Sequence, residues 1–418
     1  MSASVGFCSR WFISTCDRWL VAVDSKQDRE PFVFDCSTAE KKPKNPSTDG
    51  DEGGAEETRS DRILAFAVSP CGNLVALTDD SKRLILFRCE ASSWRCISVR
   101  FVVRRCTSLA FSQAEDQLLA ADKSGDVYSF SVLNPDQDGE LKMGHLSMVL
   151  AVTLSLDDRF IITSDRDEKI RVSCLRSPYN IQSFCLGHKQ FISALLVPPG
   201  HSQRLVSGSG DGTLRLWEFE SGRHLQSVDL RDLMDPEKTD NDNEKEKRCG
   251  VRGHRCGVRG HCVDHLYSVF TGVLSVLRVS LVQFFSLDQD QLSPHSRLTP
   301  PHQPLDVTFD PEGRLWVLMD SDHSPLQIYT HRCGSWQCDT DSPDLTRVSA
   351  AFRIHWDKLD ASVRTASRFD HLYVVNYDNV SEYMKKKQQR LDQQSQKRNL
   401  DQKRRPDAKK MKTPTANS

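Results

Sequence analysis

No two of the 14 cysteines in this 418-residue sequence stand in the C-x-x-C spacing that many metal sites and redox motifs use. The first residues, MSASVGFCSRWF, also lack the basic start and apolar run of a secretory signal peptide. The one membrane-like stretch, residues 266–277, is shorter than the roughly 20 apolar residues that span a bilayer. We therefore expect reduced cysteines in the nucleus or cytosol, no disulfide framework and no membrane segment.

A repeat of about 43 residues organises much of the chain. Similar strand-like runs begin at Leu84, Val127, Ile170 and Leu214, in steps of 43, 43 and 44 residues. A turn sequence that opens with serine begins independently at residues 69, 112 and 155, and a Gly-His pair at residues 144 and 187. Each unit consists of short strands separated by Asp-, Gly- and Ser-rich turns, with no room for a helix. Four antiparallel strands per unit predict an all-β fold of the β-propeller type.

The number of blades follows from how many such units the chain can hold. Residues 305–330 resemble a further blade, and the N-terminal run from Trp11 to Phe34 has strand character. We predict seven blades, with six or eight left open. Residues 1–35 and about 345–378 are expected to meet and close the ring, because closure removes exposed sheet edges.

The unit at residues 187–219 is similar to the repeat of WD-repeat proteins, in which four polar side chains form a buried hydrogen-bonded chain. A buried polar group is tolerated only when its partners are supplied, so a structural role is expected first. The residues concerned are His188, Ser207, Asp211 and Trp217. A catalytic His–Asp pair is the less favoured alternative, because neither a nucleophile nor a cleft is indicated.

The neighbouring unit, residues 145–173, has a weaker version of this pattern. It keeps His145, Thr163 and Asp167, but Ser173 stands where the tryptophan would be, which predicts an incomplete network. The glycines of residues 208–212 match the GxGxG of nucleotide-binding loops, yet a strand follows them instead of the helix that such loops need. We predict no catalytic residue, no cofactor and no metal in this chain.

Three segments interrupt the repeat. Residues 41–60 and 234–248 are charged and polar, so we expect disorder there. The heptapeptide RCGVRGH then occurs twice, at residues 248–254 and 255–261, and no regular turn sequence follows it up to residue 285. Residues 249–265 contain six Cys and His side chains that match no familiar zinc-finger spacing. An irregular insertion over residues 234–265 is favoured over a zinc site, and the regularity of the blade expected at 248–285 is left open.

Two clusters of charge depart from the repeat. The first is the turn sequence Asp-Arg-Asp-Glu-Lys at residues 165–169, which continues to Arg171. A solvated turn is the simpler interpretation, although charges of both signs on a projecting hairpin would also suit docking of a protein partner.

The second cluster is the C-terminal tail, where residues 384–412 hold twelve Lys or Arg against three Asp, in a chain of net charge −1. Asn379 and Glu382 resemble a capping box, and good helix formers follow. We therefore divide the chain into a propeller, residues 1–378, and a basic helix with a disordered tail, residues 379–418. A basic helix binds nucleic-acid phosphates through counterion release. Residues 403–410 also resemble a nuclear import signal, with a solubilising tail as the alternative.

Taken together, these features resemble the WD-repeat, non-catalytic subunits of tRNA (guanine-N7)-methyltransferase. The resemblance is carried by SDRDEKIRVS at residues 164–173, SGDGTLRLW at 209–217, and YDNV followed by KKK at 377–387. It implies that a separate Rossmann-type subunit holds S-adenosylmethionine and forms N7-methylguanosine in the variable loop of tRNA.

The resemblance also implies two contact surfaces. The hairpin would bind the catalytic subunit through Arg166, Asp167, Glu168, Lys169 and Arg171. The tail would bind tRNA through Lys385, Lys386, Lys387, Arg390, Lys397 and Arg398. We predict a scaffold subunit of a nuclear heterodimer, with the cytoplasm left open, that stabilises the catalytic subunit and helps to hold tRNA. A WD-repeat adaptor of a ubiquitin ligase or chromatin complex is the alternative function.

Overall fold

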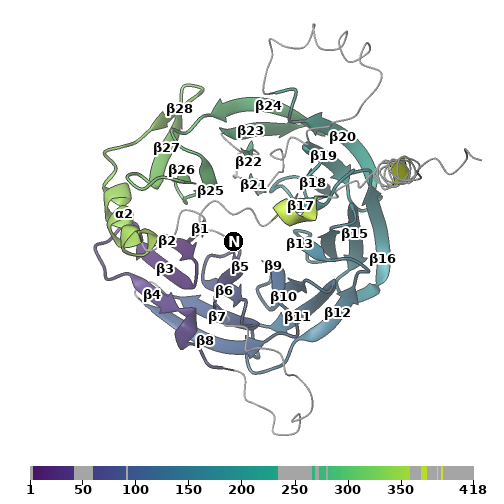
Figure 1. Cartoon of the computed structure of the whole chain (residues 1–418), viewed down its shortest axis with the longest axis horizontal. Helices are drawn as coiled ribbons and strands as arrows, with labels where there is room; N and C mark the ends of the chain where they lie inside the picture. The colour runs from purple at the N-terminus through teal and green to yellow at the C-terminus, as the bar shows by residue number, and fades with distance from the viewer. Residues whose placement is uncertain are drawn as a thin grey trace, which may run out of the picture. The chain divides into compact units, whose positions relative to one another are not determined.

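A computed structural model of the protein describes residues 3–41, 60–90, 93–233, 266–268, 273–278, 281–357, 369–373, 384 and 387–388. Its strands form seven four-stranded sheets, and within each sheet consecutive strands pair. Figure 1 shows the sheets around a common axis, with the first strand of each sheet innermost. The prediction of an all-β propeller is confirmed.

The first four sheets follow one another from the N-terminus. Their strands are β1 (Ala3–Cys8), β2 (Trp11–Cys16), β3 (Trp19–Asp24), β4 (Phe32–Asp35), β5 (Ile63–Val68), β6 (Leu74–Asp79), β7 (Arg83–Cys89), β8 (Trp94–Phe101), β9 (Cys106–Phe111), β10 (Gln117–Asp122), β11 (Asp126–Ser131), β12 (Glu140–Gly144), β13 (Val149–Leu154), β14 (Phe160–Asp165), β15 (Lys169–Cys174) and β16 (Ser177–Leu186).

The remaining three sheets are followed by the one α-helix of eight or more residues in the described ranges. These elements are β17 (Ile192–Leu196), β18 (Arg204–Ser209), β19 (Thr213–Glu218), β20 (Arg223–Asp229), β21 (Leu266–Ser268), β22 (Val273–Arg278), β23 (Leu281–Asp288), β24 (Gln291–Leu298), β25 (Pro304–Phe309), β26 (Leu315–Met319), β27 (Leu326–Arg332), β28 (Ser335–Cys338) and α2 (Pro343–Trp356). Two short 3-10 helices, η1 (Cys36–Thr38) and η2 (Asp370–Leu372), are also present.

The turn sequences spaced 43 residues apart form the same hydrogen-bonded turn in successive sheets. Ser69, Ser112 and Ser155 each accept a hydrogen bond at their hydroxyl oxygen from the backbone N–H five residues later, at 3.1, 3.1 and 3.0 Å. The next turn is closed by a carboxylate, because Asp79, Asp122 and Asp165 each accept from the N–H four residues later, in all three cases at 3.0 Å. Side chains that satisfy backbone donors in this way fix tight turns.

The core lies between neighbouring sheets, because each sheet buries both of its faces. One apolar cluster joins the first and last sheets to α2, with Phe12, Trp316, Phe352 and Trp356 all fully buried. Burial of large aromatic side chains is the main stabilising contribution in such a seam, roughly 2–3 kcal/mol each.

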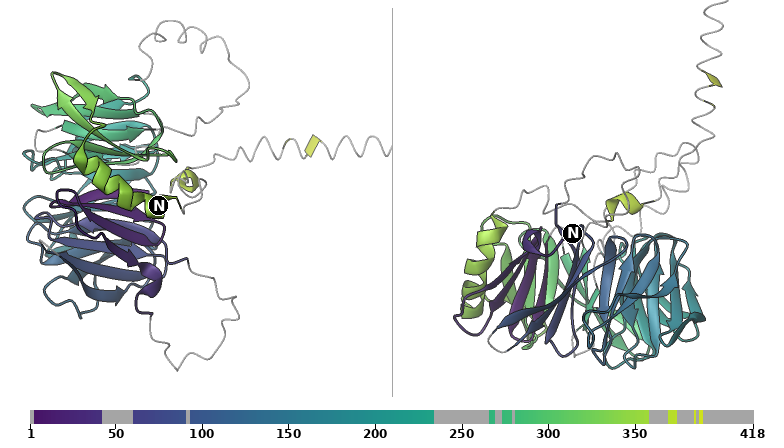
Figure 2. Two further views of the ribbon diagram at one scale, coloured as in Figure 1. Left: turned by 90° about the vertical axis from the view of Figure 1, so that its left-hand side faces the viewer. Right: turned by 90° about the horizontal axis from the view of Figure 1, so that it is seen from below.

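Residues 345–356 meet residues 3–35, as the sequence predicts, but they do so as a helix. Residues 3–35 form a complete sheet alone, and α2 at residues 343–356 packs against that sheet in the shared apolar cluster. A hydrogen bond from the backbone N–H of Val5 to Asp306 Oδ2, at 2.8 Å, joins the first sheet to the last. Helix α2 begins with Pro343, which suits the first helical turn, and its apolar residues recur at helical spacing. Because the apolar residues follow helical spacing and do not alternate as in a strand, the segment forms a helix. Figure 2 shows α2 beside the first sheet.

The irregular segment is also more regular than its sequence suggests. Residues 266–268 and 273–278 pair as strands, and residues 281–298 complete the sheet with β23 and β24. The sheet therefore begins soon after the duplicated heptapeptide. The heptapeptide, the Cys and His residues of positions 249–265 and most of the expected disordered loop at 41–60 lie outside the described residues.

Candidate partner-binding face

The charged hairpin is the tight turn between β14 and β15. Its first residue, Asp165, is buried and closes the turn by accepting from Lys169 N–H at 3.0 Å. Arg166 N–H donates to Met148 O at 2.9 Å, which fixes the turn to the loop that precedes β13. Glu168 takes the left-handed conformation with φ of 70°, where the matching turn of the next sheet has Gly212. The backbone of the hairpin is thus held firmly by the fold.

The polar network of this sheet differs from the one that the sequence predicts. His145 Nε2 bonds Thr163 Oγ1 at 2.8 Å as expected, but His145 Nδ1 lies 3.2 Å from Asp165 Oδ2 instead of pairing with Asp167. The reason is that this sheet has an aspartate at the turn-closing position, whereas the next sheet has a serine there, Ser209. The expectation for Asp167 was wrong, and its carboxylate is released from the structural network.

The hairpin side chains that take no part in the buried network lie at the surface. The side chains of Arg166 and Asp167 are 52% and 48% exposed, and their closest ion-pair approach is 3.6 Å. Lys169 Nζ donates to Asp167 O at 3.1 Å, and it lies 3.9 Å from Asp165 Oδ2. Ion pairs this exposed contribute at most about 1 kcal/mol to folding. The fold therefore gains little from these charges, which leaves them available to a ligand.

Arg171 lies half-buried behind the turn. Its Nη1 donates to Gly144 O at 3.0 Å, across the seam to the preceding sheet. Burial lowers the pKa of Arg171, partly offset by the nearby charge of Asp165. Its Nε is buried without a hydrogen-bond partner among the described residues. A buried donor without an acceptor costs about 1–3 kcal/mol, so the fold holds this side chain behind the turn at some cost.

The His188 network is complete and sealed. His188 Nδ1 lies 3.0 Å from Asp211 Oδ2, His188 Nε2 lies 2.7 Å from Ser207 Oγ, and Trp217 Nε1 donates to Ser207 Oγ at 2.8 Å. The Ser–His–Asp set has the order of a hydrolytic triad, but Ser207 is fully buried and its oxygen accepts from the indole. No substrate can reach that oxygen, so the arrangement is structural.

Electrostatics agree with a structural role. Burial lowers the pKa of His188, and the bond to Asp211 restores only part of it. Burial alone would raise the pKa of Asp211, but the hydrogen bonds and charge of His188, with bonds from Thr213 and Lys189, hold it well below its usual value. The network therefore contains a neutral imidazole beside a carboxylate at neutral pH.

An aromatic anchor, which the sequence analysis missed, lies close to the hairpin. Phe369 stacks on Phe191 with ring centroids 5.7 Å apart, and Tyr373 meets the same ring edge-on at 5.0 Å. Leu150 and Leu372 complete this buried cluster, with Met148 against it. Because Arg166 bonds the backbone of Met148, the anchor and the hairpin belong to one end of the sheets. The only sequence signal was the isolated Phe and Tyr that precede the tail.

Most of the predicted tRNA-binding residues cannot be placed. Lys387 is helical and exposed, and Met384 and Gln388 share that description. Lys385, Lys386, Arg390, Lys397 and Arg398 lie outside the described residues. Their assignment stays a prediction.

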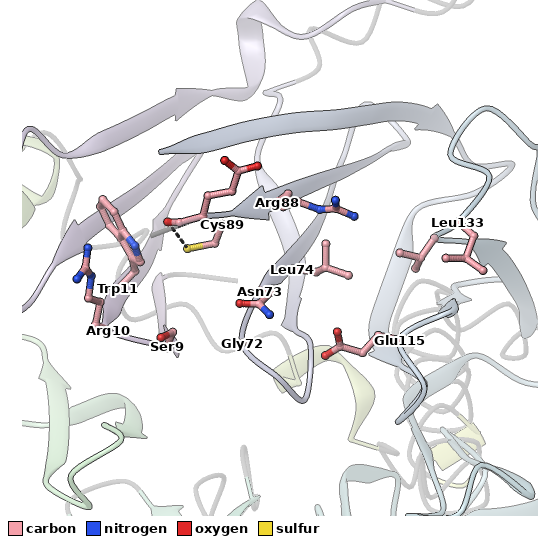
Figure 3. A pocket seen from close by; sticks show the side chains of 12 residues that line it. Ser9, Arg10, Trp11, Gly72, Asn73, Leu74, Arg88, Cys89, Glu115 and Leu133 are labelled. Carbon is pink, nitrogen blue, oxygen red and sulfur yellow. Dashed lines mark hydrogen bonds between the residues drawn. The ribbon is translucent and has the colours of Figure 1, made fainter. Parts of the chain in front are cut away.

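A cavity of about 660 Å³ opens among the first three sheets, away from the hairpin. Figure 3 shows Arg10, Trp11, Arg88, Leu133 and Cys89 among the side chains that line it. Glu115 also lines it and is engaged at 2.7 Å by Cys71 N–H. None of the predicted site residues lines this cavity. Within the described ranges no three His, Cys, Asp or Glu gather as a metal site, and no helix is long and apolar enough to cross a membrane.

Comparisons with known proteins agree on one family. A family model described as the tRNA methyltransferase TRM82 WD40 domain matches residues 22–142 and 134–340. A Danio rerio protein named tRNA (guanine-N(7)-)-methyltransferase non-catalytic subunit wdr4 is 53% identical over 400 residues, covering 94% of this chain and 93% of that protein. The Homo sapiens protein of that name, WDR4, is 43% identical over 370 residues, covering 87% and 85%.

Solved structures agree on the fold alone. The chain described as "Crystal structure of RRP9 WD40 repeats" aligns with a TM-score of 0.57 at 18% identity, covering 82% of this chain and 92% of that one. The chain described as "Structure of U3-55K" aligns with a TM-score of 0.56 at 18% identity, covering 82% and 93%.

Proposed function

This chain belongs to the TRM82/WDR4 family of WD-repeat, non-catalytic subunits of tRNA (guanine-N7)-methyltransferase, and we propose that it works by clamping its catalytic partner with the hairpin at residues 166–171 and by holding tRNA with its basic tail. Its role is non-enzymatic. The partner would hold S-adenosylmethionine and carry out the transfer to N7 of guanine.

The proposal rests on one observation: a single residue of the hairpin closes the turn, and the charged side chains that follow it are exposed. Asp165 closes the turn, and the exposed side chains of Arg166 and Asp167 contribute little to the fold. Arg171, which lies half-buried behind them, donates from Nη1 to Gly144 O at 3.0 Å and ties the hairpin to the preceding sheet. Charges of both signs on a rigid turn give a partner both orientation and discrimination.

Rigidity supports the scaffold role. We propose that the seven sheets are the blades of one closed ring, in which the seam at Val5 and Asp306 locks the first sheet to the last. A surface that is already ordered loses little entropy when a partner binds. The subunit would therefore stabilise the active conformation of its partner at small cost.

The tail supplies the nucleic-acid contact in this proposal. The chain leaves the anchor at Tyr373, and Lys385 follows twelve residues later, within about 40 Å even for an extended chain. A tether of this length lets basic residues contact tRNA while the partner is bound at the hairpin. Residues 403–410 would direct the complex to the nucleus.

The first test is charge reversal on the hairpin. The double variant Asp167→Lys, Glu168→Lys should lose co-purification with the catalytic subunit and should lose tRNA methylation in the same preparation. Asp167 is about half exposed and Glu168 lies in the turn outside the buried core, so the melting temperature should stay close to that of the wild type. Unchanged association or activity would refute the role of the hairpin.

The second test separates tRNA binding from assembly. Replacing Lys385, Lys386, Lys387 and Arg390 by glutamine should weaken tRNA binding and leave the heterodimer intact. For every phosphate that the variant no longer neutralises, the slope of log affinity against log salt should fall by about 0.7–0.9. If affinity and slope both persist, the tail does not hold tRNA.

A further inference from the structure

A patch of exposed apolar side chains borders the charged hairpin. It consists of Leu146, in the loop that joins β12 to β13, and of Ile181, Phe184 and Leu186 on β16; we call these four residues the rim patch. Leu146 is fully exposed, and Ile181, Phe184 and Leu186 are 45%, 42% and 59% exposed. Large apolar side chains gathered on a soluble protein mark interaction sites.

The register places the rim patch against the hairpin. Leu186 pairs with Lys169 and Phe184 pairs with Arg171, so each of these apolar residues on β16 lies opposite a basic residue on β15. Arg171 also bonds Gly144 O, two residues before Leu146, which brings the loop to the same seam. The apolar patch is therefore continuous with the five charged residues assigned to partner binding.

The strand that carries most of the patch has an open edge. β16 pairs only with β15 within its sheet, and at ten residues it is the longest strand in the described ranges. A long edge strand with exposed apolar side chains is an aggregation hazard unless something covers it. Protein interfaces are built in this way, with an apolar centre and a charged rim.

We propose that the rim patch is the apolar half of the interface with the catalytic methyltransferase subunit, an inference that rests on the proposed function. The partner would present an apolar surface to Leu146, Phe184 and Leu186, and carboxylates to the hairpin cations beside them. In this account the apolar contacts supply most of the affinity, and the hairpin charges set orientation and association rate.

The test compares three surface variants for binding to the purified catalytic subunit by titration calorimetry at low and high salt. Leu146→Glu and Leu186→Glu change exposed side chains, so the fold should be retained, which melting curves check. Each should raise the Kd by about tenfold or more. Salt screens the charge of the new glutamate but not the lost apolar burial, so most of the loss should remain at high salt. The control is Leu133→Glu, a 76% exposed leucine beyond the opposite end of β11, which should leave the Kd unchanged.

The outcomes separate this inference from the proposed function. Wild-type affinity in both rim variants, together with loss of binding on charge reversal of the hairpin, would overturn the rim patch and leave the proposed function intact. No binding by the wild-type chain would overturn both. Loss of tRNA affinity alone, or a concentration-dependent dimer of this chain that the variants abolish, would assign the patch to another occupant and overturn the inference. Hydrogen-exchange protection of β16 in the wild-type complex should accompany the expected result.

Discussion

Two aspartates only two residues apart should behave in opposite ways when neutralised. Asp165 is almost fully buried, and its carboxylate accepts from Lys169 N–H at 3.0 Å and lies 3.2 Å from His145 Nδ1. Asparagine has the same shape, but its amide offers a donor where the native group accepts at both oxygens. Hydrogen bonds to charged groups contribute about 1.5–3 kcal/mol each, so Asp165→Asn should lower the free energy of unfolding by about 2–4 kcal/mol.

Asp167→Asn should leave stability nearly unchanged. Its carboxylate approaches Arg166 at 3.6 Å, and both side chains are about half exposed. Solvent and salt screen such a pair, so its removal should cost under about 1 kcal/mol. If Asp167 meets a desolvated cation on the catalytic subunit, the same change should raise the Kd by at least tenfold, about 1.4 kcal/mol.

The assay measures both quantities on the same two proteins. Denaturant unfolding gives the stability difference, and titration of the catalytic subunit gives the Kd. The reasoning would be refuted if Asp167→Asn destabilised the fold as much as Asp165→Asn, since Asp167 would then belong to the structural network after all.

Further predictions concern the sealed network, the anchor and the turn. Because burial lowers the folded-state pKa of His188 below its ordinary value of 6.5, the unfolded chain binds the proton more readily. The contribution of His188 to the free energy of unfolding should therefore be constant above about pH 6.5 and fall as the pH drops below it. His188→Gln should show a shallower fall of melting temperature over pH 7.5–5.0 than the wild type, and equal slopes would contradict a neutral buried imidazole. Phe369→Ala removes the ring stacked on Phe191, so tRNA affinity should drop in a filter-binding assay while the subunits still co-elute; unchanged affinity would mean that the anchor does not position the tail. Glu168 has the left-handed backbone conformation, which costs an L residue about 1–2 kcal/mol, and Glu168→Gly should remove this cost. The greater flexibility of glycine in the unfolded chain offsets part of the gain, so the melting temperature should be at or above that of the wild type. Partner binding should be weaker, because the charge of Glu168 is lost.

The sequence predicts the repeated parts of the fold well, because their signals are local. The serines at 69, 112 and 155 and the aspartates at 79, 122 and 165 each bond a backbone N–H a fixed number of residues away. A spacing that recurs at 43 residues therefore translates directly into recurring turns. The His188 chain follows for the same reason, since all of its members belong to one sheet.

The features that the sequence analysis missed or misassigned have two causes: contacts between distant residues, and a local substitution at the turn that follows β14. The closure of the ring depends on how α2 packs against the first and last sheets, and residues 345–356 alone do not reveal that surface. The partner of His145 depends on which of two nearby aspartates closes the turn. The spacing in the next sheet suggests Asp167, whereas the structure shows Asp165. The contact of Phe369 with Phe191 joins residues far apart in the sequence, so no local pattern indicates it.

The most direct test of the central claim is reconstitution of tRNA methylation from separately purified subunits. The catalytic subunit should form a one-to-one complex with this chain, and N7-methylguanosine should accumulate in tRNA at a much higher rate with this chain present than without it. The Asp167→Lys, Glu168→Lys variant should fail to restore that rate although it remains folded. Equal methylation by the catalytic subunit alone, or full restoration by the hairpin variant, would contradict the account.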